Sequence, residues 1–84
     1  MDNTIRGKVL ELLAEQQGVD LGGITDNADL YEAGLTSFAS VQLMLAIEDN
    51  FGVEFSENML NRKTFASLSN IVGGIATLLA QKAA

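Results

Sequence analysis

Apolar residues recur with helical spacing at the beginning of the chain. They fall at i, i+4, i+7 and i+8, namely Ile5, Val9, Leu12 and Leu13. This period predicts a helix from Asn3 or Thr4 to Gln17, and Gly18 is expected to end it because glycine readily takes the left-handed conformation that follows a helix.

A similar pattern closes the chain and predicts a core helix from Phe65 to about Gln81, with Thr64 as its N-cap. Its apolar residues are Phe65, Leu68, Ile71, Val72, Ile75, Leu78 and Leu79. Gly73 and Gly74 lie inside the pattern, where each glycine weakens a helix by about 1 kcal/mol relative to alanine. We therefore expect them to allow the close approach of a neighbouring element.

The middle of the chain predicts a helix over residues 38–51 that ends at Gly52. On a helical wheel its apolar residues form two stripes. The wider stripe contains Leu43, Met44, Ile47 and Phe51, and the other contains Phe38, Val41 and Leu45. One helix of a small domain cannot bury both stripes, so the wider one is expected to face the core. The narrower one is then exposed, with Glu48 and Asp49 at its border.

Two irregular segments connect these helices. Residues 18–36 form a long loop whose isolated apolar residues are expected to pack against the helices: Leu21, Ile24, Leu30 and Leu35. Asp26 and Asp29 are interpreted as turn or cap residues, residues 30–33 as a short turn before Gly34, and Ser56 as the cap of a short third helix. The sequence thus predicts one all-α domain over residues 1–84, a four-helix bundle with three longer helices, one short helix and a long first loop.

Ser37 falls at or near the N-cap of the middle helix, and its hydroxyl has two interpretations. It either accepts a hydrogen bond from a free backbone N–H, worth about 1 kcal/mol, or is a covalent attachment point for a phosphate-linked group. A helix N-terminus suits a phosphodiester because its N–H groups and dipole favour negative charge. The exposed stripe beside Ser37 favours attachment, since it suits partners that act on the attached group; burial of the stripe by a partner subunit is the alternative.

Composition narrows the function further. Hydrophobic residues make up 48% of the chain and charged residues 19%, which favours a folded domain over disorder. Eleven acidic against five basic residues give a net charge of −6. This charge argues against a nucleic-acid surface and predicts partners with basic patches.

Cysteine and histidine are both absent from the sequence. This excludes disulfides, thiolate nucleophiles, Cys/His zinc sites and a serine triad with an imidazole base, so the domain is not expected to be an enzyme. The paired carboxylates of the first loop are too few to predict a metal site. No signal peptide or membrane span is evident, which predicts a cytoplasmic protein.

Four segments occur in a specific order around Ser37: Asp29-Leu30, Gly34-Leu35-Thr36-Ser37-Phe38, Val41-Gln42-Leu43 and residues 47–55. In these segments the chain resembles the acyl carrier protein family over most of its length. The resemblance implies that Ser37 carries 4′-phosphopantetheine covalently, and that the chain presents acyl groups as thioesters in lipid, fatty acid or polyketide-type biosynthesis. It also implies that the interior between the second and last helices can shelter an acyl chain. The residues expected to recognise partners are Phe38, Val41, Leu45, Glu48 and Asp49.

The chain departs from the family pattern at the front of the middle helix. Thr36, Ala39 and Gln42 stand where the family commonly has acidic residues, and Phe38 stands where it has leucine. Because charges at the rim of an interface govern partner choice, this predicts a specialised carrier with its own enzymes. The expected partners are a phosphopantetheinyl transferase and acyl-loading and acyl-transferring enzymes with basic docking patches, acting on a monomer.

Two alternatives remain open. A peptidyl or aminoacyl carrier has the same fold and arm and differs only in what is loaded. An unmodified helical interaction module differs in kind, because Ser37 then only caps the helix and the exposed stripe binds a permanent partner.

Overall fold

The computed structural model describes residues 3–16 and 18–83, and all regular structure within these ranges is helical. Helix α1 spans Asn3–Ala14, α2 spans Ser37–Phe51 and α3 spans Leu68–Ala83, and a 3-10 helix, η1, spans Glu57–Met59. The all-α prediction is confirmed. The predicted count of four helices is not, because the described residues form three α-helices and one 3-10 turn.

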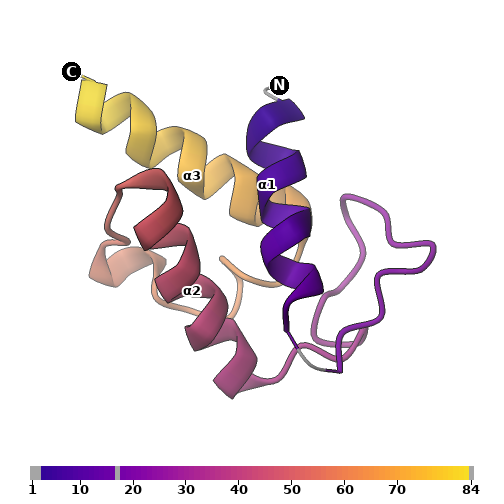
Figure 1. The fold of residues 1–84 in the computed structure, drawn as a ribbon. Coiled ribbons are helices and arrows are strands. Elements are labelled where there is room, and N and C mark those ends of the chain that lie inside the picture. Colours follow the sequence, from indigo (N-terminus) through magenta and orange to yellow (C-terminus); the bar gives the residue numbers. More distant parts are fainter. Residues whose placement is uncertain (1–2, 17, 84) are drawn as a thin grey trace.

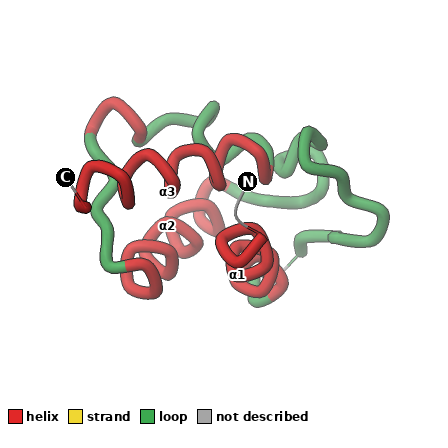
Figure 2. Tube along the Cα trace, turned by 90° about the horizontal axis from the view of Figure 1, so that it is seen from above, coloured by secondary structure: helices red, strands yellow, loops and turns green. Residues whose placement is uncertain are grey.

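Helix α1 is the element that joins the other two, since it packs against both α2 and α3. In Figure 1, α3 passes behind α1, and the view from above in Figure 2 places it along one side of the α1–α2 pair. The first loop extends beside α1 and returns beneath it to the beginning of α2 (Figure 1). None of the described helices has the length and apolar character that a membrane span requires.

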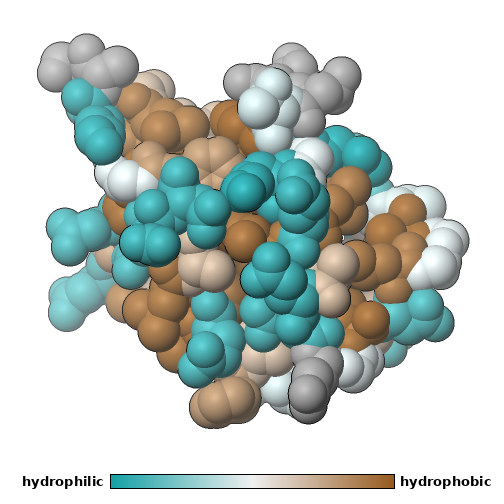
Figure 3. Space-filling model, in the orientation of Figure 1, coloured by the Kyte–Doolittle hydropathy of each residue, from teal (hydrophilic) through white to brown (hydrophobic). Residues whose placement is uncertain are grey.

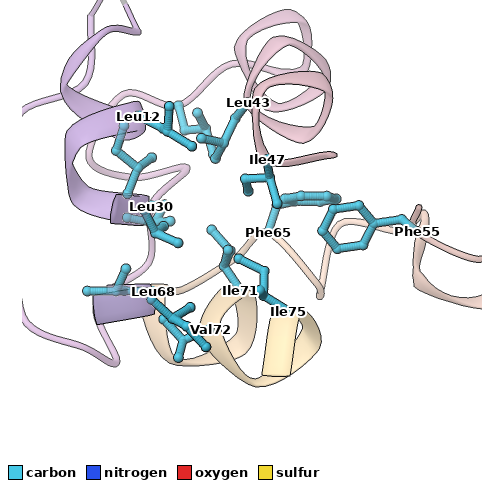
Figure 4. Packing of buried hydrophobic residues seen from close by; sticks show 14 of the residues in the cluster. Leu12, Leu30, Leu43, Ile47, Phe55, Phe65, Leu68, Ile71, Val72 and Ile75 are labelled. Carbon is cyan, nitrogen blue, oxygen red and sulfur yellow. The ribbon is translucent and has the colours of Figure 1, made fainter. Parts of the chain in front are cut away.

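A single core holds the helices together, and side chains from all three helices converge in it (Figure 4). The largest side chains that are fully buried are Val9, Leu13, Leu30, Leu43, Ile47, Leu68, Ile71 and Ile75. Burying an aliphatic side chain of this size contributes about 1.5–3 kcal/mol. The wider stripe of α2 therefore faces the core, as predicted, and the face that carries it cannot turn toward solvent without losing this burial.

The first loop is closed by backbone contacts rather than left open. Asp20 N donates a hydrogen bond to Ala33 O at 2.8 Å. Gly34 has a φ of +112°, and a Cβ at this position would overlap the carbonyl oxygen of Gly18. The loop can close in this way only because Gly34 has no side chain.

The predicted packing of the loop is confirmed. Leu30 and Leu35 are buried, and Leu21 and Ile24 are half-buried against the core. These four side chains add the loop to the hydrophobic core, so the loop reaches the start of α2 along a defined path.

The two loop aspartates have different roles. Asp29 acts as a turn residue, as expected, because its Oδ1 accepts a hydrogen bond from Tyr31 N at 2.9 Å. Asp26 instead forms an ion pair with Arg6 of α1, at 2.8 Å between Arg6 Nη2 and Asp26 Oδ1. Asp26 still lies in a turn, as expected, but its carboxylate ties the loop to α1.

Helix α1 ends earlier than its apolar spacing predicts. Its last residue is Ala14, and the amides of Glu15 and Gln16 donate to carbonyls only three residues back. These shorter-range hydrogen bonds form a tighter turn, which ends the α-helix before Gly18, the residue expected to end it. The predicted last residue, Gln17, lies outside the described residues.

Helix α3 begins at Leu68, not at Phe65, and its first turn is capped by Ser67 rather than Thr64. Ser67 Oγ accepts a hydrogen bond from Asn70 N at 3.1 Å. Phe65 is buried, but it lies in the turn that precedes the helix. Its helical spacing from the later apolar residues therefore reflects a shared core and not a shared helix.

The expected close approach at the paired glycines of α3 occurs at one of them. A Cβ on Gly74 would lie 3.1 Å from Met59 Cε of η1, whereas one on Gly73 would meet nothing within 4 Å. Ser56 precedes η1 as predicted, but its side chain makes no capping hydrogen bond. Met59 of the short third helix therefore lies close to α3 at Gly74.

Candidate functional site

The first turn of α2 is capped by Thr36, the residue before Ser37. Thr36 is extended, with φ −85° and ψ 165°, and its Oγ1 accepts a hydrogen bond from Ala39 N at 3.0 Å. Its carbonyl oxygen accepts from Ser40 N at 2.8 Å. Ser37 is thus the first residue of the helix, and the interpretation of its side chain as the cap is wrong.

The Ser37 hydroxyl is exposed and unused by the fold. No described residue forms a hydrogen bond with Ser37 Oγ, although Ser37 O accepts one from Ser40 Oγ at 2.7 Å. The backbone N–H groups of Ser37 and Phe38 likewise have no partner among the described residues. The site therefore offers a reactive oxygen beside two free N–H donors at the positive end of a helix dipole, which suits a phosphodiester.

Helix α2 has one buried face and one exposed face, as its two stripes predict. Leu43 and Ile47 are fully buried. On the opposite face, Phe38 is 75% exposed and Val41 and Leu45 are each 50% exposed. The exposure predicted for this stripe is confirmed, and the stripe begins next to Ser37.

A fourth exposed apolar residue was not anticipated from the sequence. Leu60, which follows η1, is 50% exposed, and it lines the same cavity as Val41 and Ser37. No periodic pattern surrounds Leu60 in the sequence, so only the fold brings it beside α2. Figure 3 shows one face of the molecule, on which hydrophobic residues lie among hydrophilic ones.

Glu48 and Asp49 border the exposed stripe but differ in their contacts. Glu48 is half-buried, and its Oε2 accepts a hydrogen bond from Phe55 N at 2.9 Å. Asp49 is exposed, and its side chain makes no hydrogen bond or ion pair with the described residues. Glu48 therefore fixes the segment after α2, a role that its position in the sequence does not reveal.

A cavity of about 380 Å³ lies between the front of α2 and the segment before α3. Its lining consists of Tyr31, Ser37, Ser40, Val41, Met44, Leu60, Asn61, Arg62 and Phe65. The Arg62 guanidinium lies over the Tyr31 ring, 3.8 Å from its centroid. Arg62 belongs to the basic cluster at residues 61–63, and its closeness to Ser37 depends on a tertiary contact.

Asn61, in the same cluster, organises the turn that precedes α3. Its Oδ1 accepts hydrogen bonds from Thr64 N at 3.0 Å and Thr64 Oγ1 at 3.2 Å, and its Nδ2 donates to Asn58 O at 2.8 Å. The Asn61 side chain is therefore occupied by the turn, whereas Arg62 and Lys63 remain exposed beside it.

Comparison with known proteins gives consistent matches to carriers. A family model described as the phosphopantetheine attachment site matches residues 7–72. An aminoacyl carrier protein from Agrobacterium fabrum is 50% identical over 86 aligned positions, which cover 100% of this chain and 99% of the relative. A non-reducing polyketide synthase from Preussia isomera is 33% identical over 64 residues, 75% of this chain but 3% of that protein.

The comparison with solved structures also gives a match in a complex that contains a carrier protein. One crystal structure contains an engineered glycine:[carrier protein] ligase from Bradyrhizobium japonicum, complexed with a carrier protein from Agrobacterium tumefaciens and ATP. A chain in it matches with a TM-score of 0.80 and 47% identity, over 87% of this chain and 97% of that chain. These findings, with the free hydroxyl at the start of α2, show that the chain belongs to the phosphopantetheine attachment family, carrier proteins that hold covalent 4′-phosphopantetheine and serve partner enzymes without being catalysts themselves.

Proposed function

We propose that this protein is an aminoacyl carrier in which Ser37 bears the 4′-phosphopantetheine arm. The observation that carries the proposal is the Ser37 hydroxyl, which is exposed, unbonded and placed at the first turn of α2. When attached, the arm supplies a thiol that holds the cargo as a thioester. The chain itself contributes location, because a tethered substrate has a raised effective concentration at each docked active site.

The relatives favour an amino acid as the cargo. The relative that matches the whole chain is named an aminoacyl carrier protein, and the matched structure is a complex of a carrier with a glycine:[carrier protein] ligase. We therefore propose a carrier:amino acid ligase, acting on glycine or another small amino acid, as the loading partner. A phosphopantetheinyl transferase is the second proposed partner. The comparisons give no support to fatty acid biosynthesis.

The proposed recognition surface is the exposed side of α2, formed by Phe38, Val41, Leu45, Glu48 and Asp49. Residues 37–47 include no charged side chain, although the chain has a net charge of −6. Glu48, the first acidic residue of α2, also bonds the backbone at Phe55. We therefore propose that partners meet the front of α2 through apolar contacts, and that basic patches on a partner act only toward Asp49.

An acyl carrier of the polyketide type is the second candidate. It is supported by the 33% identity to a segment of a non-reducing polyketide synthase. The two candidates share Ser37 and the arm and differ in cargo, so the loading reaction separates them.

The test begins with intact mass after incubation with a phosphopantetheinyl transferase and coenzyme A. We expect a gain of one phosphopantetheinyl unit in the wild-type chain and in Ser40→Ala, and none in Ser37→Ala. Ser40 is the matched control because its hydroxyl lines the same cavity but donates to Ser37 O. Absence of any gain in the wild type would instead favour an unmodified interaction module.

The cargo is tested next with the modified chain. Incubated with the Bradyrhizobium japonicum glycine:[carrier protein] ligase, ATP and single amino acids, it should gain one aminoacyl unit that hydroxylamine removes. Loading by a malonyl or acyl transferase, with none by the ligase, would assign the chain to the acyl carriers.

A further inference from the structure

A second hollow lies between the first half of α3 and the segment that precedes this helix. Its volume is about 310 Å³, and its lining comes from η1, from the turn at residues 61–64 and from residues 69–74 of α3. None of its lining residues belongs to α2. It is therefore distinct from the cavity beside Ser37, although Asn61 lines both.

Gly73 leaves the backbone of α3 open within this hollow. Gly73 is exposed, and a Cβ there would meet nothing within 4 Å, whereas a Cβ on Gly74 would lie 3.1 Å from Met59 Cε. Packing within the described chain thus accounts for the absence of a side chain at Gly74 but not at Gly73. A glycine inside a helix weakens the helix relative to alanine, but it allows another element to come close to the backbone.

The lining of the hollow includes a cation and a hydroxyl that the fold does not use. Lys63 is exposed, and its ammonium forms no hydrogen bond or ion pair with the described residues. Asn70 Nδ2 donates to Lys63 O at 2.8 Å, which holds the lysine backbone against α3. Ser69 Oγ also has no hydrogen-bond partner in the described part of the chain. A carboxylate suits both groups, since it accepts hydrogen bonds and pairs with an ammonium.

The hollow adjoins the proposed recognition surface. Asn61 separates it from the cavity that Val41 of the exposed stripe lines. A specific interface covers about 800 Å² of each partner, and the whole accessible surface of this domain is 5020 Å². A single partner docked on the stripe of α2 is therefore large enough to reach both sides of Asn61.

We infer that the loading ligase extends from α2 across Asn61 onto this hollow, where one of its carboxylate side chains pairs with Lys63 and the same element packs over Gly73. The inference rests on the proposed aminoacyl carrier function. Arg62 and Lys63 are adjacent exposed cations in a chain with a net charge of −6. Most of the surface repels an acidic group of the ligase and this part attracts it, so the contact fixes the orientation in which the ligase docks.

The test measures loading of the modified full chain by the glycine:[carrier protein] ligase with ATP and glycine, at varied carrier concentration. Modification of each variant is confirmed by intact mass. Gly73→Ala should raise the Tm by about 4 °C, because alanine is the better helix former. The same methyl group should raise the KM for the carrier about fivefold with kcat unchanged, because it occupies the space of the docked element. A purely structural role of Gly73 would not combine a more stable fold with weaker docking.

Helix α1 offers a matched control for each variant. Gly7 lies inside α1, a Cβ there also meets nothing within 4 Å, and it does not line the hollow. Gly7→Ala should therefore raise the Tm without changing the KM. Lys63→Gln should raise the KM about two- to fivefold, the range of an exposed ion pair, and Lys63→Glu should raise it further. Lys8→Gln, which makes the same change in net charge on α1, should leave the KM unchanged.

Normal loading of Gly73→Ala and of both Lys63 variants would overturn the extension of the ligase onto α3 and leave the carrier function intact. Equal increases of KM in Lys63→Gln and Lys8→Gln would overturn the role of Lys63, since net charge alone would then account for both. If Gly73→Ala does not fold, the comparison of the lysine variants decides. Absence of loading of the wild-type chain would overturn the proposed function itself, so the two failures are distinguishable.

Discussion

Residues 15–36 and residues 52–67 both connect helices beside the proposed site, but the contacts that hold them in place differ. The first connection is closed by its main chain: Asp20 N bonds Ala33 O at 2.8 Å, and Gly34 abuts the carbonyl of Gly18. It therefore leaves little freedom where α2 begins.

In the second connection, side chains at both of its ends add to the backbone bonds of its turns. Glu48 Oε2 bonds Phe55 N at 2.9 Å, Asn61 Oδ1 bonds Thr64 N at 3.0 Å, and Lys82 Nζ donates to Gly52 O at 2.7 Å. The bonds of Asn61 and Lys82 are exposed to solvent, whereas the bond from Phe55 N to Glu48 is partly buried.

The comparison indicates a division of roles around the Ser37 hydroxyl. The first connection fixes its position, because the loop backbone leads directly into the cap at Thr36. The second connection supplies the opposite wall of the cavity through two exposed residues, Leu60 directly after the 3-10 turn and Arg62 in the turn before α3. We therefore expect substitutions in the first connection to change the position of the Ser37 hydroxyl. Substitutions in the second connection should change how partners recognise the site.

The largest effect is expected from Gly34→Ala. A methyl group there would overlap the Gly18 carbonyl at a φ of +112°, which alanine adopts only with strain. We expect a loss of unfolding free energy of about 3 kcal/mol or more, measured by urea denaturation. Gly23→Ala is the control, since φ is +73° but a Cβ meets nothing within 4 Å; it should cost about 1 kcal/mol. Equal losses in the two variants would show that the contact with Gly18 is unimportant.

An intermediate effect is expected from Glu48→Ala in the second connection. The substitution leaves the partly buried N–H of Phe55 without its carboxylate acceptor, so unfolding free energy should fall by about 2 kcal/mol. Asp49→Ala, one position along the same helix, should change it by less than about 0.5 kcal/mol because Asp49 is exposed. Denaturant curves that coincide for the two variants would contradict the structural role of Glu48.

The smallest effect is expected where the first connection meets α2. Thr36→Ala removes the cap and should cost about 1 kcal/mol in thermal or urea unfolding. Ser37→Ala should change stability by less than about 0.5 kcal/mol, since its hydroxyl makes no bond within the described structure. If Ser37→Ala lowered the free energy of unfolding more than Thr36→Ala, then Ser37, and not Thr36, would be the cap of the helix.

Local features of the structure could be predicted from the sequence. The two stripes of α2 depend only on helical period, and Gly52 ends the helix with a φ of +65°, as expected for a glycine C-cap. The exposure of the stripe containing Phe38 followed from the size of the chain, because a small core accepts one face of a helix. The start of α2 was predicted to within one residue, since a helix over residues 38–51 was expected and the helix spans Ser37–Phe51.

Features that depend on distant pairings could not be predicted. The start of α3 is delayed by the turn at residues 61–66, which also holds the first loop through a 2.7 Å bond from Leu30 N to Ala66 O. The stacking of Arg62 on Tyr31 likewise joins residues far apart in the sequence. Spacing along one segment contains no information about either contact, so the wall of the cavity became visible only in the folded chain.

The separation of capping from attachment has a thermodynamic consequence. Because α2 takes its cap from Thr36, esterifying the neighbouring oxygen breaks no bond on which the native state depends. Esterification at that oxygen would therefore not weaken the cap, whatever the nearby N–H groups and helix dipole contribute to the attached group. Under the proposed attachment, the hydrogen bond that begins α2 would stay intact through repeated addition and removal of the group.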